Sequence, residues 1–455
     1  MFGSAVSRWT MLHFGAAITF FVLAQLAMVS GLAFPAAALV APTTLATVHL
    51  LTIGWLTILM LGALHQFVPV ITAQGAVAGT SALVSLIAIL LGLGGMEAGF
   101  LALGGVLPAP AVLALPAGGT LVLGGAVVAA ASLARTLWRT RPLPFAARFV
   151  AIGLVFLFAA LGLGIVLGLG FSSPDLISWT GAFGDGLRLH LLAGLIGWFM
   201  LTAMGVSYRL LSMFTLAPEE RGLLGTFVLV LSAGGLAATW LLGVAEAMGA
   251  PVTDVVVAIA AAVTGLGVVL YLLDMARLYR ARRRHKLELN TGMALAALAA
   301  LALSIVLALY ACASDFAEPV IGALGYLFLF GWLSGLGLGQ LYKIVPFLTW
   351  LERYGSLLGK QPVPRVQDLV DERRDRPWFI LYFAAVAAGT LLAVLGWPVL
   401  FRVAVLGHLV ATLMIVRALW LVRHSLPRVT VPIVPPASLK AGAPSRSTAN
   451  LSTTE

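Results

Sequence analysis

His49–Pro69 reads HLLTIGWLTILMLGALHQFVP, and its spacing of glycine, tryptophan and a ring side chain recurs twice further along the chain. Each copy has a Gly-Trp pair, followed by three matched residues 8, 11 and 15 positions after the first glycine. The copies are Gly54-Trp55, Gly62, His65 and Pro69; Gly197-Trp198, Gly205, Tyr208 and Ser212; and Gly331-Trp332, Gly339, Tyr342 and Pro346. A repeat at intervals of 143 and 134 residues predicts one structural unit used three times.

The composition makes that unit a membrane unit. Hydrophobic residues form 61% of the chain, charged residues only 10%, and the mean hydropathy is +1.05. An apolar run of about 20 residues spans a bilayer as a helix. The sequence contains twelve such runs: 9–33, 43–72, 79–100, 111–134, 147–171, 187–214, 222–245, 252–276, 289–313, 319–350, 377–396 and 398–422. We therefore predict an all-α polytopic protein with twelve transmembrane helices, four in each repeat.

The expected organisation is one membrane domain, residues 1–426, followed by a tail. The repeats cover about 1–144, 145–287 and 288–426, and the patterned helix is the second of each set of four. The tail, 427–455, is rich in Pro, Ser, Thr and Ala and is expected to be disordered in the cytoplasm. The first apolar run is interpreted as a retained helix, since it is longer than the core of a signal peptide.

The basic residues predict the orientation. With an amino terminus in the cytoplasm, all of the 27 Lys and Arg residues except Arg188 and Arg402 fall on the cytoplasmic side. Basic residues resist translocation, so we expect the protein in the inner (cytoplasmic) membrane, with both termini on the cytoplasmic side. The net charge of +10 then indicates contact with anionic lipid and no nucleic-acid partner. The single Cys312 excludes a disulfide framework and a Cys-based metal cluster.

Three four-helix arcs with both termini inside resemble subunit I of the haem-copper oxidases. The pattern itself is most similar to the C-type (cbb) oxidases and the large subunits of nitric oxide reductases, whose tenth helix carries histidines followed by Gly-Trp, Gly, Tyr and Pro at these spacings. His49 stands five residues before Gly54, as a family histidine stands before its Gly-Trp. His190 opens helix 6, where the family has a copper ligand. The resemblance covers the twelve-helix topology, and in residues mainly helices 2, 6 and 10.

The sequence also departs from that family. Tyr326, five residues before Gly331, stands where the family keeps a haem-ligand histidine, and helix 7 contains no histidine. A binuclear haem-copper centre needs an axial imidazole for iron and about three for copper. Copper, and reduction of oxygen or nitric oxide at such a centre, are therefore not expected, and other enzymatic activity is left open.

Ionisable residues within predicted membrane helices are the candidate site residues, because burying them is expensive. His49, His190 and His408 are candidate ligands of a haem or metal, against the alternative that each donates to a helix carbonyl and simply packs. We expect His49 and His408 to share a b-type haem, with Arg402 near its propionates and Arg188 a second candidate. His65 and His13 are interpreted as structural, and the three tryptophans as packing residues between arcs.

Three functions remain open at this stage. The first is a divergent member of the oxidase scaffold that binds b-type haem, passes electrons or senses a small gas, and has a respiratory or electron-donor subunit as partner. The second is a non-redox pore or carrier on the same scaffold. The third is an assembly partner of a true oxidase. The sequence contains no c-type haem motif and no phosphate-binding loop.

Overall fold

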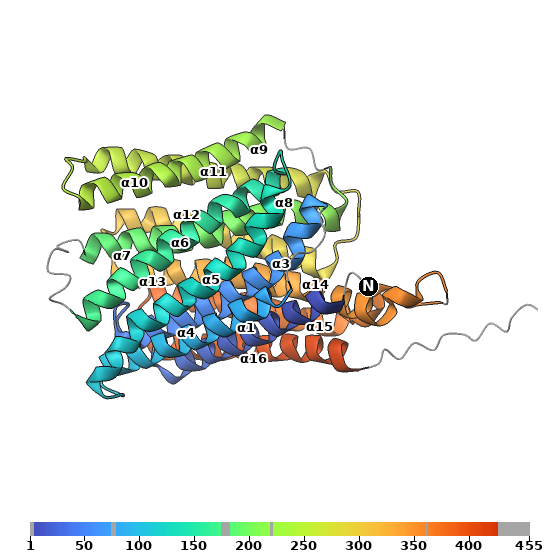
Figure 1. Ribbon diagram of the computed structural model, residues 1–455, viewed down its shortest axis with the longest axis horizontal. Helices are drawn as coiled ribbons and strands as arrows, with labels where there is room; N and C mark the ends of the chain where they lie inside the picture. The colour runs from blue at the N-terminus through green and yellow to red at the C-terminus, as the bar shows by residue number, and fades with distance from the viewer. Residues whose placement is uncertain (1–3, 74–78, 174–182, 219–221, 361, 426–455) are drawn as a thin grey trace, which may run out of the picture.

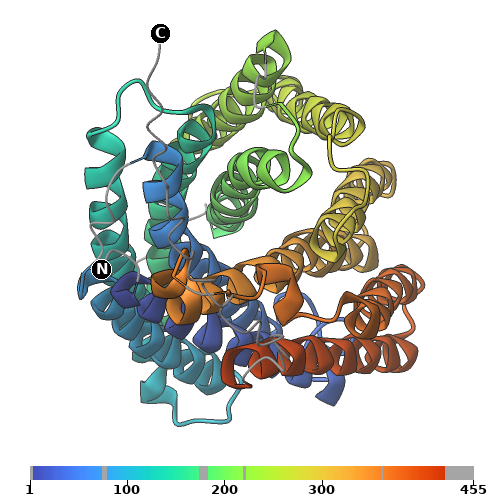
Figure 2. The same cartoon turned by 90° about the vertical axis from the view of Figure 1, so that its right-hand side faces the viewer.

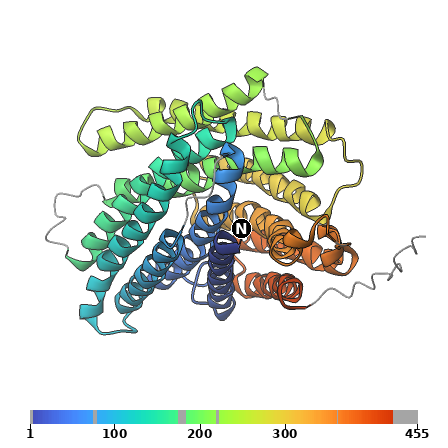
Figure 3. The same cartoon turned by 45° about the vertical axis from the view of Figure 1, so that its right-hand side comes forward.

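A computed structural model describes residues 4–73, 79–173, 183–218, 222–360 and 362–425. Within these ranges the protein is all-helical, and twelve helical spans are long and apolar enough to cross a membrane, which confirms the predicted fold class. Figures 1 and 3 show them packed side by side as one bundle. The prediction for the tail, 427–455, lies outside the described residues.

Several spans are composites of consecutive helical segments. The elements in chain order are α1 (Ser4–Ser30); α2 (Pro42–His49), η1 (Leu50–Thr57) and α3 (Ile58–Thr72); α4 (Ser81–Leu103); η2 (Ala109–Leu113) and α5 (Ala114–Trp138); α6 (Phe145–Ser172); α7 (Phe183–Leu191), η4 (Leu192–Met200) and α8 (Leu201–Thr215); α9 (Gly222–Leu229), η5 (Val230–Gly234) and α10 (Gly235–Ala247); α11 (Asp254–Arg280); α12 (Leu289–Ala313); α13 (Glu318–Tyr326), η6 (Leu327–Ser334) and α14 (Gly335–Tyr354); η7 (Gly355–Leu357); η8 (Val366–Leu369); α15 (Glu372–Val394); and α16 (Pro398–His424).

The three patterned helices share a local distortion. Each changes from α-helix to π-helix over a short segment that contains its Gly-Trp pair: η1, η4 and η6. A π-helical turn takes in an extra residue and occurs mostly at functional or strained positions. In each span, the residues before the Gly-Trp pair therefore point in a different direction from the one they would have in a regular α-helix.

The repeated glycines are in close contact with the first helix of their own repeat. A Cβ on Gly54 would lie 2.6 Å from the Phe20 Cβ, and one on Gly62 would lie 2.5 Å from the His13 Cβ. The second repeat places Phe156 and Phe149 at the same two points, and the third places Ala300 and Met293 there. The contacting residues are seven apart in all three first helices. Glycine is required because any side chain at these positions would push the neighbouring helix away.

The three tryptophans join the repeats at the centre of the molecule. The Trp198 Nε1–H donates to Thr57 Oγ1 over 3.1 Å, and the Trp55 Nε1–H donates to Ser334 Oγ over 2.9 Å. Both acceptors stand three residues after the first glycine of their own copy, and in the second copy that position holds Met200. In the part of the chain that the structure describes, Trp332 Nε1 accordingly has no hydrogen-bond partner. The tryptophans thus pack between the arcs, as interpreted from the sequence.

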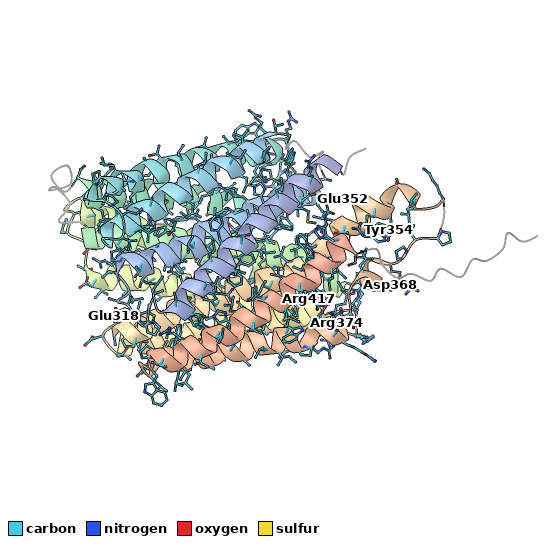
Figure 4. The ribbon with its side chains drawn as sticks, turned by 90° about the horizontal axis from the view of Figure 1, so that it is seen from below. Glu318, Glu352, Tyr354, Asp368, Arg374 and Arg417 are labelled. Carbon is cyan, nitrogen blue, oxygen red and sulfur yellow. The ribbon has the colours of Figure 1, made fainter. Side chains whose placement is uncertain are left out.

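The patterned spans are the interior of the bundle. Trp55, Trp198 and Trp332 are all fully buried, and Figure 2, seen along the helices, shows the green α8 enclosed by its neighbours. Charged residues gather at the two ends: Figure 4 places Glu318 at one end and Glu352, Asp368, Arg374 and Arg417 at the other. The beginning of α1 and the end of α16 share that second end (Figure 1). This arrangement leaves an apolar belt between the ends, facing the lipid bilayer.

Candidate metal centre

His49 and His190 lie beside each other across the first and second repeats. Their ring centroids are 6.4 Å apart, with 29° between the ring planes. His49 is the last residue of α2 and His190 the penultimate residue of α7, so both directly precede a π-helical segment. Both residues are half-buried. We name them the α2–α7 histidine pair.

Both rings of this pair are oriented by backbone carbonyls. Nδ1 of His49 lies 2.7 Å from the Leu45 carbonyl oxygen, and Nδ1 of His190 lies 2.8 Å from the Ala160 carbonyl oxygen on α6. A carbonyl only accepts, so each Nδ1 carries the proton and each neutral ring keeps a lone pair on Nε2. This is the arrangement that metal-ligating histidines show, with the second nitrogen fixing the tautomer and the ring.

The separation of the two rings suits one metal ion between them. With metal–nitrogen bonds of about 2.0 Å, and about 1.2 Å from each nitrogen to its ring centre, two imidazoles on one ion have centroids at most about 6.4 Å apart. The observed separation equals this limit, which corresponds to ligands on opposite sides of the metal. Opposite imidazoles are the axial geometry of a six-coordinate haem iron. Two neutral imidazoles at this separation are donors that a haem iron or another metal ion can take.

The residues around the pair are apolar or small, with one exception. The Phe100 ring lies 5.0 Å from His49, and a Cβ on Gly164 would lie 3.1 Å from His190 Cε1. Leu93, Glu97 and Phe100 occupy one face of α4, and Leu93 contacts Gly54 of the patterned helix. Glu97 thus faces the same helix as its two neighbours, and its Oε1 is buried with no partner among the described residues.

His408 lies in a different group of residues from His49, contrary to the expected pairing. Its Nδ1 is 2.8 Å from Gln25 Oε1 of α1, and the Phe330, Tyr382 and Tyr326 rings lie 5.1, 5.9 and 6.0 Å from its own. We name these five residues the His408 cluster. His408 is fully buried, and its Nε2 has no partner within the described residues. Three aromatic rings surround His408, and none of its printed contacts is with His49. His49 lies instead beside Phe100 of α4 and His190 of α7.

The two arginines have separate surroundings. Arg402 Nε donates to the Val29 carbonyl over 2.6 Å, and its guanidinium covers Gly31, so it fastens the beginning of α16 to the end of α1. Arg402 therefore stabilises the contact between α1 and α16. It lies on the same helix as His408 and not beside the α2–α7 histidine pair. Arg188 is exposed and stands two residues before His190 on α7.

A second histidine pair joins α1 and α3, where sequence reasoning interpreted both residues as structural. His13 and His65 have ring centroids 5.9 Å apart. The signal in the sequence was the histidine at offset 11 of the first copy, where the other copies carry tyrosine. Within the described residues, no group of three or more His, Cys, Asp or Glu side chains is placed to hold a metal ion.

Comparison with known proteins relates this fold to one solved class. The chain matches the structure described as "Cryo-EM structure of a heme-copper terminal oxidase dimer provides insights into its catalytic mechanism", with a TM-score of 0.58 over 93% of this chain and 83% of that one. Sequence identity is 11%, so the likeness is one of fold. No protein-family model matches the sequence, and no curated protein matches it. The protein is thus an integral membrane protein with a haem-copper-oxidase-like fold.

Proposed function

We propose that this chain is a divergent member of the haem-copper oxidase subunit I superfamily that holds a b-type haem iron between His49 and His190. The observation that carries the proposal is the α2–α7 pair: two neutral imidazoles on different repeats, each oriented by a carbonyl, at the separation of opposite ligands on one metal. A bound haem would supply one-electron redox chemistry. Electron transfer or the sensing of a small gas is the role that follows.

The protein residues around that site have defined tasks. The carbonyls of Leu45 and Ala160 keep both Nδ1 atoms protonated and so keep both Nε2 atoms available as ligands. Gly164 lets α6 pack closely against the His190 ring, since a Cβ there would lie 3.1 Å from Cε1. The buried Oε1 of Glu97, on the face of α4 that contacts the helix of His49, has no hydrogen-bond partner among the described residues and is a polar group close to the proposed site.

The residues favour electron transfer or sensing over oxygen reduction. The span Gly222–Ala247 and the span Glu318–Leu357 contain no histidine, and Tyr326 fills the histidine position of the latter. The His190 Nδ1–H donates to the Ala160 carbonyl oxygen of α6, and its ring lies 6.4 Å from that of His49. The set of imidazoles for a copper ion beside a haem is therefore incomplete.

We further propose the setting of the protein. The basic residues favour an inner membrane location with both termini in the cytoplasm, and the repeats 1–144, 145–287 and 288–426 as units of one domain. An electron-carrying function would require a respiratory or electron-donor subunit as partner. Reporter fusions within 277–288 and 352–376 should report a cytoplasmic side, and an external signal from either would contradict this orientation.

The test of the haem site is the visible spectrum of the purified full-length chain. We expect a reduced-minus-oxidised spectrum of a b-type haem that is lost in both His49→Ala and His190→Ala. His285→Ala is the matched control, since His285 is exposed and outside the spans, and it should keep the spectrum. A preparation without haem, from cells that supply it to other cytochromes, would contradict the proposal and favour the pore, carrier or assembly functions.

A further inference from the structure

The α1–α3 histidine pair, His13 and His65, carries two nitrogens that the fold does not use. Nδ1 of His13 is 2.9 Å from the Trp9 carbonyl oxygen, and Nδ1 of His65 is 2.6 Å from the Leu61 carbonyl oxygen. Both Nδ1 atoms therefore donate, and both Nε2 atoms are acceptors. His13 is 1% exposed and His65 3%, and neither Nε2 has a partner among the described residues. These two Nε2 acceptors cannot hydrogen-bond to each other, so the contact between the rings lacks a cation or a hydrogen-bond donor that would bind them.

The other repeats show that packing alone does not require histidine here. In the second repeat the same two positions hold Phe149 and Tyr208, whose ring centroids are also 5.9 Å apart. The Tyr208 hydroxyl donates to Asp274 over 3.0 Å, and in the third repeat the Tyr342 hydroxyl donates to Asp375 over 2.7 Å. The polar tip at offset 11 is thus satisfied by a carboxylate in two repeats. In the first repeat it faces a second histidine instead.

The nearby polar groups are already committed. The Thr10 hydroxyl donates to the Gly62 carbonyl oxygen over 3.2 Å, and the Gln66 amide donates to Thr10 over 3.2 Å. Gly62 also brings α1 so close that a Cβ there would lie 2.5 Å from the His13 Cβ. The two imidazoles are therefore held by close helix contact and receive no hydrogen bond from these neighbours.

We propose that His13 and His65 bind a single monovalent copper ion, Cu(I), through their Nε2 atoms. A separation of 5.9 Å between the centroids corresponds to a nitrogen–metal–nitrogen angle of about 135°, given bonds of about 2.0 Å. Cu(I) accepts two or three ligands and so tolerates a bent pair of this kind, and imidazole suits copper. A zinc ion requires about four ligands, and no third His, Cys, Asp or Glu joins the pair within the described residues. A single positive charge is also the less costly one to bury without a counter-ion.

The chain supplies a matched variant for the test. His13→Phe with His65→Tyr installs the ring pair of the second repeat, so it removes both ligands and keeps the packing. The experiment uses the detergent-solubilised full chain in a His49→Ala/His190→Ala background, which excludes the α2–α7 pair. Cu(I) is supplied anaerobically from a chelator of known affinity. We expect about one equivalent bound by the background protein and none by the protein with the two additional substitutions.

The ligands can also be read without any substitution at His13 or His65. X-ray absorption of the copper-loaded background protein should show two nitrogen ligands at about 2.0 Å and no sulfur. No uptake of Cu(I), or equal uptake after His13→Phe/His65→Tyr, would overturn the proposal and indicate a water molecule between the rings. The haem proposal is tested separately, because the same two substitutions in the otherwise unchanged chain should leave its visible spectrum intact.

Discussion

The patterned helices of the first and third repeats share a backbone and differ in what their polar side chains meet. Five residues before the glycine, the first has His49, half-buried beside His190, and the third has Tyr326, buried among Phe330, Phe401 and His408. At offset 11, His65 keeps a free acceptor where Tyr342 donates to Asp375. At the tryptophan it is the third repeat that has the unpartnered atom, because Trp55 Nε1 is hydrogen-bonded and Trp332 Nε1 is not, among the described residues. The repeat sets how closely the helices pack. Single residue differences between the copies decide whether each polar atom finds a hydrogen-bond partner within the protein.

The largest expected effect that separates these regions is on stability at the His408 cluster. His408→Ala removes a fully buried ring and leaves Gln25 with one fewer partner, at a cost of about 3 kcal/mol, as for other buried aromatic residues. The free energy of unfolding in detergent measures it, and the visible spectrum should be unchanged. A loss of the haem spectrum at normal stability would break the comparison, because it would place the cofactor in the third repeat.

A smaller difference is expected at offset 11. Tyr342→Phe leaves the buried Asp375 carboxylate without its 2.7 Å hydrogen bond and should cost about 2 kcal/mol of unfolding free energy. The matched substitution His65→Phe in metal-free protein removes an Nε2 that has no partner and should cost less. Equal losses for the two variants, measured side by side, would show that His65 is already satisfied by an unseen water molecule.

The tryptophans should differ by about the worth of one hydrogen bond. Trp55→Phe breaks the contact with Ser334, whereas Trp332→Phe breaks none, and the ring volumes removed are the same. We expect Trp55→Phe to lower the unfolding free energy by about 1 kcal/mol more than Trp332→Phe. If Trp332→Phe proves the more costly of the two, the central contacts are not as described.

The smallest effect is a coupling at the third tryptophan. Met200→Ser places a hydroxyl at the position of Thr57 and Ser334, while losing some apolar packing. Combined with Trp332→Phe in a double-mutant cycle, the Trp332–Ser pair should show a favourable coupling of about 1 kcal/mol. A coupling near zero would mean that residue 200 does not complete the set of contacts that Thr57 and Ser334 make.

The sequence predicted the elements of this fold well, since lipid imposes simple rules. Apolar runs marked the twelve spans to within a few residues at most ends, although the helix predicted to end at 350 continues to Tyr354. The polar segment Val366–Arg374 forms a 3₁₀ turn followed by the beginning of α15, where Asp371 accepts from the Arg373 and Arg374 amides.

The site was predicted less well, because it depends on helix rotation. His49 and His190 were identified from their cost in a membrane, but their partnership was not, since a period of 3.6 residues misplaces every residue before a π-helical segment. The residues that contact the repeated glycines were also missed. Their spacing of seven is the same in each repeat, but the loops that follow differ in length, so the pattern does not align with the Gly-Trp pairs.

The most direct measurement of the central claim is near-infrared magnetic circular dichroism of the oxidised, purified chain, which identifies the axial ligands of a haem iron. We predict the signal of a low-spin iron with two imidazole ligands, lost or altered in His49→Ala and in His190→Ala but not in His408→Ala. A bis-imidazole signal that survives removal of His49 or His190, or an iron with any other pair of axial ligands, would contradict the account.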